Sequence, residues 1–287
     1  ERAGIPKGVL SIITSNKSQI IGEEFCSNSK VRKLTFTGST EVGKILLKQG
    51  SSQVLKMSME LGGNAPFIVF DDADLDAAVE GAILSKYRNN GQTCVCANRL
   101  YVQEKVYDEF AQKLSNAVSK FEVGDGFNEN VTLGPLITED AVLKVENHIN
   151  DALSKGAKLI TGGSRHKLGG NFFEPTLLTE VTKNMVVSTN ETFGPVAPLF
   201  RFKDEDDVIN QANDTIFGLA AYFYSKDLSR VWKVSEALEY GMVGVNAGVI
   251  STELAPFGGV KQSGLGREGS KHGIEEFLEM KYICMSV

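Results

Sequence analysis

Short runs of β-branched and other apolar residues alternate with longer amphipathic segments along the 287 residues of the chain. Strands that alternate with segments of helical period predict an α/β fold, because each helix carries the chain back to a neighbouring strand of a partly parallel sheet. We therefore expect an α/β protein. The expected strands cover residues 9–13, 34–37, 54–59, 67–70, 100–102, 158–160, 196–202, 219–224 and 242–245.

Amphipathic helices are expected between these strands. Asp72 or Asp74 is expected to cap the helix that contains Leu75 and Val79, and Gly156 is expected to end another helix. The expected helices cover residues 39–49, 75–84, 107–121, 138–155, 205–213 and 228–238. The apolar segment 281–285 is expected to be a strand that adds to another sheet, including a partner's sheet.

Composition and charge exclude several classes of protein. Hydrophobic residues make up 42% and charged residues 23% of the chain, which is typical of a globular protein and excludes disorder, collagen and coiled coil. The net charge of −6, without a basic run, argues against a nucleic-acid partner. No stretch approaches 18 consecutive apolar residues, so we expect no membrane partner.

Cysteine and histidine usage points to a reduced protein without a metal site. Four cysteines are too few for a disulfide scaffold. None of the three histidines has ligand spacing to another histidine or to a cysteine, so no zinc site is expected. The chain begins with Glu1 and has neither an apolar signal core nor a transit pattern, and we expect it to be part of a longer protein.

Two motifs end in strand-to-loop transitions that suit a functional site. Gly38 and Ser39 lie between a strand and a helix start, where free backbone N–H groups favour a phosphate; the alternative is a plain helix cap. Glu60 ends an apolar strand directly before Gly62 and Gly63, at the rim where functional groups collect. The alternative for Glu60 is a solvated carboxylate at a strand end.

Three further motifs are loops that contain glycine. Cys94 and Cys96 lie in the loop GQTCVC, where a thiol is either reactive or a small buried residue. Glu191 and Phe193 form the turn ETFGP. The segment PFGGVKQSGLGREG is rich in glycine, and we expect it to end in a short basic helix start.

Taken in order, FTGSTEVG, MELGGNAP, GQTC, ETFGP and PFGGVKQSGLGREG resemble the aldehyde dehydrogenase superfamily over essentially the whole chain. KYRNNGQTCVCANRLYVQ and GREGSKHGIEEFLEMKY are most similar to its succinate-semialdehyde dehydrogenases. The resemblance implies a partial Rossmann-type cofactor domain and an α/β catalytic domain. It assigns residues 1–61 to the cofactor domain, 62–262 to the catalytic domain, and 263–287 to a return segment with an oligomerisation strand.

The resemblance also implies a catalytic mechanism. Cys94 matches the nucleophile, which forms a thiohemiacetal and then a thioester, and its backbone N–H matches half of the oxyanion hole. Glu60 matches the general base that activates the hydrolytic water. Ser39, beside Gly38, matches a pyrophosphate contact, and Glu191 matches the residue that binds the nicotinamide ribose, with Phe193 beside it. NAD is the expected cofactor, and NADP is not excluded.

The expected substrate, oligomeric state and cellular location rest on the same resemblance. Arg88 matches an arginine that binds the distal carboxylate of succinate semialdehyde, and Ser251 and Thr252 are expected to add hydroxyl contacts. The alternative for Arg88 is a solvated charge at a helix C-terminus. Other candidate substrates are glutarate semialdehyde and a neutral aldehyde. A homotetramer is expected, in the mitochondrial matrix or, for a bacterial-type protein, in the cytoplasm.

Two residues that the resemblance calls for lie outside this chain, and the role of Cys96 stays a hypothesis. The family's second oxyanion donor and second substrate arginine lie upstream of Glu1, so we expect the isolated chain to be an inactive C-terminal fragment, and a non-catalytic module stays an alternative. Cys96 does not match the nucleophile. We hypothesise that oxidation joins Cys94 and Cys96 in a strained disulfide that blocks catalysis; the alternative is that Cys96 is simply packed under the loop.

Overall fold

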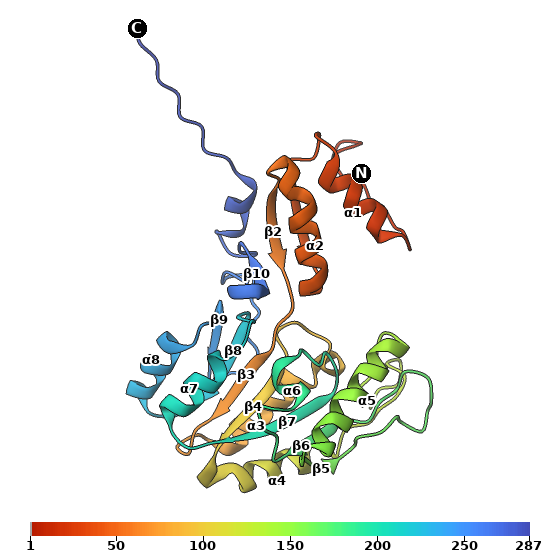
Figure 1. Ribbon diagram of the computed structural model, residues 1–287, viewed down its shortest axis with the longest axis vertical. Coiled ribbons are helices and arrows are strands. Elements are labelled where there is room, and N and C mark those ends of the chain that lie inside the picture. Colours follow the sequence, from red (N-terminus) through yellow and green to blue (C-terminus); the bar gives the residue numbers. More distant parts are fainter. Residues whose placement is uncertain (1) are drawn as a thin grey trace.

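The computed structural model describes residues 2–287 and contains two β-sheets (Figure 1). In the smaller sheet, β1 (Lys33–Thr37) pairs in parallel with β2 (Lys56–Glu60), and β10 (Gly264–Leu265) pairs antiparallel with β2. Helices α1 (Ser18–Ser27) and α2 (Thr40–Gly50) lie beside this sheet. No helix in residues 2–287 combines the length and the apolar character that crossing a membrane requires.

The larger sheet has seven strands in the order β5-β6-β7-β4-β3-β8-β9, and only β5 runs antiparallel to its neighbour. A mostly parallel sheet must bury both faces, and its strands accordingly read as apolar runs. The strands are β3 (Ala65–Val69), β4 (Ala97–Gln103), β5 (Lys158–Thr161), β6 (Thr176–Thr179), β7 (Val196–Phe202), β8 (Ala220–Tyr224) and β9 (Met242–Val245).

Helices cover both faces of the larger sheet. On one face, Phe67 and Val69 of β3 pack against α3 (Leu75–Lys86) and α4 (Tyr107–Val118). On the other face, Ile68 packs in a core that includes α5 (Glu139–Ser154), α7 (Glu205–Asn213) and α8 (Leu228–Ala237). This alternation follows from the two-residue period of a strand. The short helix α6 (Val186–Thr189) precedes β7.

The helix starts follow the capping rules. Asp74, not Asp72, caps α3, because its carboxylate accepts from the N–H groups of Asp76 and Ala77. Thr138 caps α5 in the same way, and Gly156 follows that helix with a φ of +98°. The Gly156 conformation is one that a glycine adopts without strain.

One expected strand is wrong, the addition of another to a partner's sheet stays a prediction, and several elements were not expected. Residues 9–13 form no strand, and their apolar side chains are exposed because no neighbouring strand pairs with them. Residues 281–285 are extended but unpaired among the described residues, in the tail that leaves the molecule in Figure 1. The expected basic helix start after Gly264 is instead β10 followed by a bridge between Phe257 and Glu268. The sequence analysis missed α1, β6 and α6.

Candidate active site

Cys94 lies in a tight turn directly before β4. The backbone N–H of Cys96 donates to the carbonyl oxygen of Thr93 at 3.0 Å, so Cys94 and Val95 are the two central residues of a β-turn. A Cβ atom on Gly63 would lie 2.4 Å from the carbonyl oxygen of Cys94. The double-glycine turn therefore permits a close approach of the loop after β2 to the turn that carries the thiol.

The approach to this turn is left-handed. Asn89, Asn90 and Gly91 have φ values of 52°, 58° and 75° in succession, a conformation that asparagine and glycine tolerate best. A Cβ atom on Gly91 would lie 2.1 Å from the carbonyl oxygen of Gly194, so only glycine fits there. The Asn90 amide donates to the carbonyl oxygen of Gly134 at 2.9 Å. The thiol loop is thus held against two other segments of the chain.

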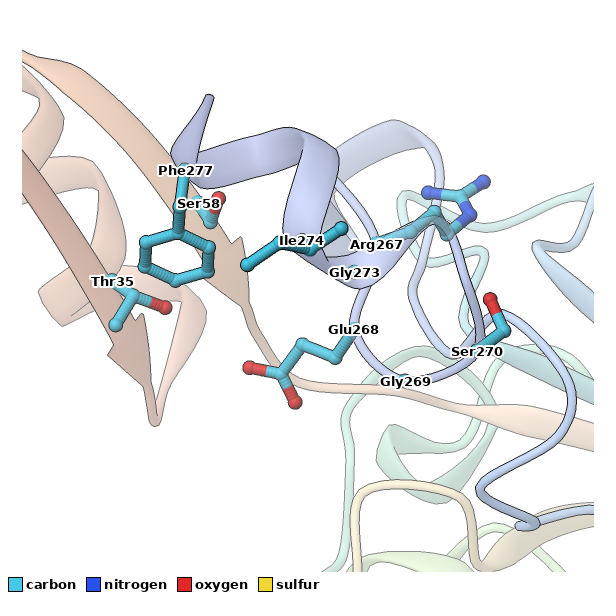
Figure 2. A pocket seen from close by; sticks show the side chains of 9 residues that line it. All are labelled: Thr35, Ser58, Arg267, Glu268, Gly269, Ser270, Gly273, Ile274 and Phe277. Carbon is cyan, nitrogen blue, oxygen red and sulfur yellow. The ribbon is translucent and has the colours of Figure 1, made fainter. Parts of the chain in front are cut away.

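Glu60 ends β2, is buried, and has a carboxylate oxygen without a hydrogen-bond partner among the described residues. Burial, together with the neighbouring Glu268 carboxylate, raises the pKa of Glu60 to about 8, although Arg267 acts in the opposite direction. Figure 2 shows Glu268 and Arg267 on the segment that lines a cavity of about 350 Å³ beside Thr35 of β1. Glu60 is therefore a buried carboxyl group that can exchange a proton near neutral pH, not a solvated strand end.

The structure brings Cys94, Glu60 and Glu191 together. Burial raises the pKa of the half-buried Cys94 thiol to about 11, and the carboxylates of Glu191 and Glu60 contribute to the rise. The geometry agrees, because Glu60 lies three residues before Gly63, whose N–H binds Glu191 and whose Cβ position lies 2.4 Å from the Cys94 carbonyl oxygen. The site therefore combines a thiol nucleophile with a carboxyl group of raised pKa, which is a chemistry suited to acyl transfer.

Glu191 is fixed to the double-glycine turn. Its carboxylate accepts a hydrogen bond from the backbone N–H of Gly63 at 3.0 Å. Burial raises the pKa of Glu191, while this hydrogen bond and the nearby Lys144 and Lys86 oppose the rise. Phe193 lies two residues further on, half-buried, with a φ of +53°.

Gly38 and Ser39 lie at the N-terminus of α2. The Ser39 hydroxyl oxygen accepts from the N–H of Val42 at 3.3 Å, so the plain helix cap is present. The helix also directs unpaired N–H groups of its first turn toward this end. A Cβ atom on Gly62 would lie 3.0 Å from Glu191 Oε2 and 3.3 Å from Thr40 Oγ1. The first turn of α2 and the Glu191 carboxylate thus converge on one glycine cradle, which fits a ligand carrying a phosphate and a sugar hydroxyl.

Among residues 2–287, the two expected substrate residues make no hydrogen bond or ion pair with the residues of this cradle. Arg88 is exposed and has no ion-pair partner among residues 2–287, and its guanidinium partly offsets the burial that raises the pKa of Tyr222. Thr252 is exposed in the loop after β9 and lines a cavity of about 310 Å³ with Ile250 and Phe257. The guanidinium of Arg88 is thus accessible to an anion. The expected hydroxyl contact of Thr252 stays a prediction.

Cys96 is buried directly behind the turn. Its thiol donates to the carbonyl oxygen of Lys86 at 3.7 Å and lies 2.6 Å from Thr93 Oγ1. All four cysteines are free. These contacts match the packed alternative, and the disulfide stays a hypothesis that requires the Cys96 thiol to leave both partners.

Sequence reasoning missed two buried groups around the site. Tyr222 of β8 donates from its hydroxyl group to the carbonyl oxygen of Val95 at 2.8 Å, and Lys86 at the end of α3 is completely buried. Tyr222 belongs to none of the quoted motifs. Lys86 opens the segment KYRNNGQTCVC, and its charge within a helix that faces the core was a visible signal. Within the described part of the chain, no three His, Cys, Asp or Glu side chains are grouped so that they could hold a metal ion.

Comparisons with known proteins agree with this geometry. The model of the aldehyde dehydrogenase family matches residues 1–283. The chain is 65% identical over 286 residues to the NADP(+) succinate-semialdehyde dehydrogenase GabD of Escherichia coli K12, covering 100% of this chain and 59% of that protein. It is also 65% identical over 285 residues to the glutarate-semialdehyde dehydrogenase of Pseudomonas aeruginosa, covering 99% and 59%.

A solved structure gives the same result for the fold. The succinate-semialdehyde dehydrogenase from Burkholderia pseudomallei superposes with a TM-score of 0.97 at 66% identity, covering 100% of this chain and 59% of that one. The chain therefore spans about 59% of the length of these relatives.

Proposed function

The chain belongs to the aldehyde dehydrogenase family, and on that premise we propose that it carries the nucleophile, the general base and part of the dinucleotide site of an enzyme that oxidises a semialdehyde. The single observation that carries the proposal is the convergence of Cys94, Glu60 and Glu191 on the double-glycine turn. A thiol, a buried carboxyl and a ribose-binding carboxylate are the three groups that such an oxidation requires.

In the proposed reaction the Cys94 thiol loses its proton to the solvent, and the resulting thiolate attacks the aldehyde carbon to form the oxyanion of a thiohemiacetal. The backbone N–H of Cys94 stabilises the oxyanion, and loss of hydride from the same carbon leaves a thioester on the sulfur. Glu60 then takes a proton from the water that attacks the thioester, which releases the acid and the thiol. The raised pKa of Glu60, about 8, suits a group that must accept and return a proton near neutral pH.

The cofactor we propose is NAD or NADP. Its pyrophosphate would be held by Ser39, Gly38 and the first turn of α2, and its nicotinamide ribose by Glu191, with Phe193 beside the ring. When bound, the dinucleotide supplies the nicotinamide that accepts the hydride. The glycine cradle at Gly62 supports this placement, since a side chain there would fill the space between Glu191 and Thr40.

The substrate we propose is succinate semialdehyde, with Arg88 binding its distal carboxylate and Thr252 adding a hydroxyl contact. The exposed, unpaired guanidinium of Arg88 supports a substrate that carries a carboxylate. Glutarate semialdehyde is the second candidate, because it carries the same carboxylate one methylene further away and a relative of equal identity is named for it.

The test compares Cys94→Ala with Cys284→Ala in the full-length enzyme. Cys94→Ala is expected to abolish both production of reduced dinucleotide and hydrolysis of a simple ester, because both need the nucleophile. Cys284→Ala, which removes an exposed thiol outside this turn, should retain both activities. Retention of either activity by Cys94→Ala would remove Cys94 from the role, and inactivity of the full-length wild type with every semialdehyde would favour the non-catalytic alternative.

A further inference from the structure

The side chain of Tyr222 reaches from β8, the strand next to the edge strand β9 of the larger sheet, to the turn that carries Cys94. Tyr222 lies on β8, is fully buried, and donates a hydrogen bond from its hydroxyl group to the carbonyl oxygen of Val95 at 2.8 Å. Tyr222 and Val95 are 127 residues apart in the chain. Val95 directly follows Cys94, so this contact joins the sheet to the peptide next to the thiol.

Each carbonyl group of the turn has a defined neighbour. The carbonyl of Thr93 accepts from the N–H of Cys96 and closes the turn. The carbonyl of Cys94 lies over Gly63, where no side chain is present. The carbonyl of Val95 has the Tyr222 hydroxyl as its partner. Among residues 2–287, Tyr222 thus supplies the one side-chain hydrogen bond that a distant element makes to the backbone of this turn.

We propose that Tyr222 is a positioning residue for Cys94: its phenol fixes the orientation of the Val95 peptide and thereby the β-turn that presents the thiol and its own N–H to the substrate. This inference rests on the proposed role of Cys94 as nucleophile. Tyr222 touches no reacting atom in this arrangement. It acts through the turn, whose two central residues share one backbone geometry.

A tyrosine suits this task for physical reasons. Its side chain has few rotatable bonds. Its ring lies beside the ring of Phe67 on β3, with 6.1 Å between the two ring centroids. Burial raises the pKa of Tyr222, so the phenol stays protonated and remains a donor across the working range of pH. Loss of the hydroxyl would leave the Val95 carbonyl unpaired in the interior and allow its peptide to rotate.

The measured step is the acylation of Cys94 by p-nitrophenyl acetate, which needs no dinucleotide. The Cys94 thiolate attacks the ester carbonyl carbon, the bond to p-nitrophenolate breaks, and an acetyl thioester remains. The first turnover, followed by the release of p-nitrophenolate, reports how well the turn places the sulfur and the backbone N–H. The rate of this first turnover does not depend on the later deacylation step, in which Glu60 acts.

Tyr222→Phe is compared with Tyr107→Phe in the full-length enzyme. The buried Tyr107 hydroxyl donates to the carbonyl oxygen of Leu199 at 3.0 Å and accepts from the N–H of Glu180 at 2.9 Å, on the same face of the sheet but at β6 and β7. Tyr107→Phe therefore loses more hydrogen bonding than Tyr222→Phe and should lower the Tm at least as much. We expect Tyr222→Phe to slow acylation about tenfold or more, with KM for the dinucleotide within about twofold of wild type. Tyr107→Phe should leave acylation within about twofold.

Equal acylation rates in the two variants would overturn the inference. Thr93→Val provides a second test that keeps Tyr222 and holds even if Tyr222→Phe does not fold. It removes the hydroxyl that contacts Cys96 Sγ at the other end of the turn, and it should slow acylation in the same direction. If it does not, the turn is not what places Cys94, and the inference fails. A Cys94→Ala variant that is still acylated would instead overturn the proposed function.

Discussion

Lys86 is completely buried at the end of α3, and its ammonium group donates a hydrogen bond to the side-chain oxygen of Asn98 at 2.9 Å. Among the described residues Asn98 is the one hydrogen-bond partner of this ammonium, and no carboxylate lies within ion-pair distance. Burial lowers the pKa of Lys86 to about 8, and the nearby Cys96 and Glu191 only partly oppose this. A buried charge with a single neutral partner lowers the stability of the folded state.

Lys86→Met should therefore change the pH dependence of unfolding. Below pH 8 the lysine is protonated in the folded and the unfolded chain, so the wild type bears the full cost of the buried charge. Between about pH 8 and 10.5 the unfolded chain holds a proton that the folded chain has released, so wild-type stability rises relative to Lys86→Met by about 3 kcal/mol in total. Urea unfolding of both proteins from pH 7 to 10 measures this difference.

The matched control for Lys86 is Lys120→Met, which removes an exposed lysine. Its free energy of unfolding should differ from that of the wild type by the same amount at every pH. A constant difference for Lys86→Met as well would show that the buried ammonium is not destabilised.

Glu60→Gln should preserve acylation of Cys94 and slow the release of the acyl group, because the amide cannot take a proton from the attacking water. In the wild type, deacylation should become faster as the pH rises through about 8, where Glu60 loses its proton. Rapid-mixing kinetics would show a normal burst followed by a much slower steady state. Glu236→Gln, at an exposed position on α8, should leave both phases unchanged. Unchanged steady-state turnover in Glu60→Gln would show that another group is the base.

Arg88→Ala should raise KM for succinate semialdehyde far more than KM for an uncharged aldehyde of similar length. The loss of a charge-assisted pair is worth about 1.5–3 kcal/mol, or roughly 10- to 150-fold in kcat/KM. Arg32→Ala, at another exposed arginine, should change neither value. An equal effect of Arg88→Ala on both aldehydes would remove the carboxylate-binding role.

Local sequence signals predicted those elements that are also locally determined. The helix α7 (Glu205–Asn213) and the strand β7 (Val196–Phe202) have the expected bounds, because a cap and a clear period define the first and a long apolar run the second. Residues 9–13 have equally strong β-propensity but no partner strand, and pairing decides whether such a run becomes a strand. β6 has only four residues, and its place in the sheet depends on β5 and β7.

The same distinction between local signals and long-range contacts holds for the residues of the site. Glu60 stands directly before a loop that contains glycine, and Cys94 and Glu191 stand in such loops, so turn chemistry pointed to all three. The roles of Tyr222 and Lys86 depend on contacts with Val95 and Asn98 that arise only when strands β4 and β8 come into register with β3. Periodicity alone marks such residues as core and says nothing of the polar group at their ends.

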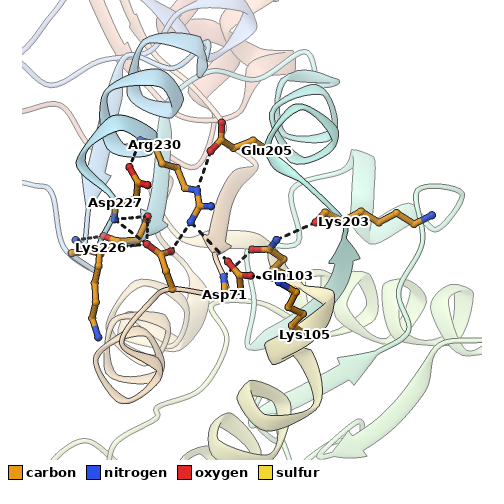
Figure 3. Close-up of polar contacts among 11 residues, drawn as sticks. Asp71, Gln103, Lys105, Lys203, Glu205, Lys226, Asp227 and Arg230 are labelled. Carbon is orange, nitrogen blue, oxygen red and sulfur yellow. Dashed lines mark hydrogen bonds and ion pairs between the residues drawn. The ribbon is translucent and has the colours of Figure 1, made fainter.

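Asp72 joins the end of β3 to the loop before α8. Its carboxylate accepts hydrogen bonds from Ser225 Oγ and from the N–H groups of Lys226 and Asp227, and it pairs with Arg230 at 2.7 Å. Figure 3 shows the polar contacts around Arg230, Asp227 and Lys226. Burial alone would raise the pKa of Asp72, but these hydrogen bonds and the guanidinium lower it.

Asp72→Ala should therefore reduce the free energy of unfolding by about 2 kcal/mol at pH 7. The stabilisation is present above the pKa of the unfolded carboxyl and is lost as the pH falls through the lower pKa of the folded one, so the difference should shrink in acid. Asp71→Ala removes the neighbouring carboxylate, with its ion pair to the exposed Lys105 and its longer one of 3.9 Å to Arg230, and should cost less than half as much. Urea unfolding at pH 7 and below pH 4 checks both statements, and an Asp72 effect no larger than that of Asp71 would contradict them.

The hypothesis of a Cys94–Cys96 disulfide makes a prediction about recovery from oxidation. Closing the bond requires Cys96 Sγ to leave the Lys86 carbonyl and Thr93 Oγ1, and the small ring should be strained and therefore easily reduced. If the bond forms, it protects Cys94 from irreversible oxidation. After peroxide and then dithiothreitol, the wild type should regain more activity than Cys96→Ala, because the unprotected thiolate of the variant passes to sulfinic acid. Equal recovery in the two proteins would mean that Cys96 is only a small residue packed behind the turn.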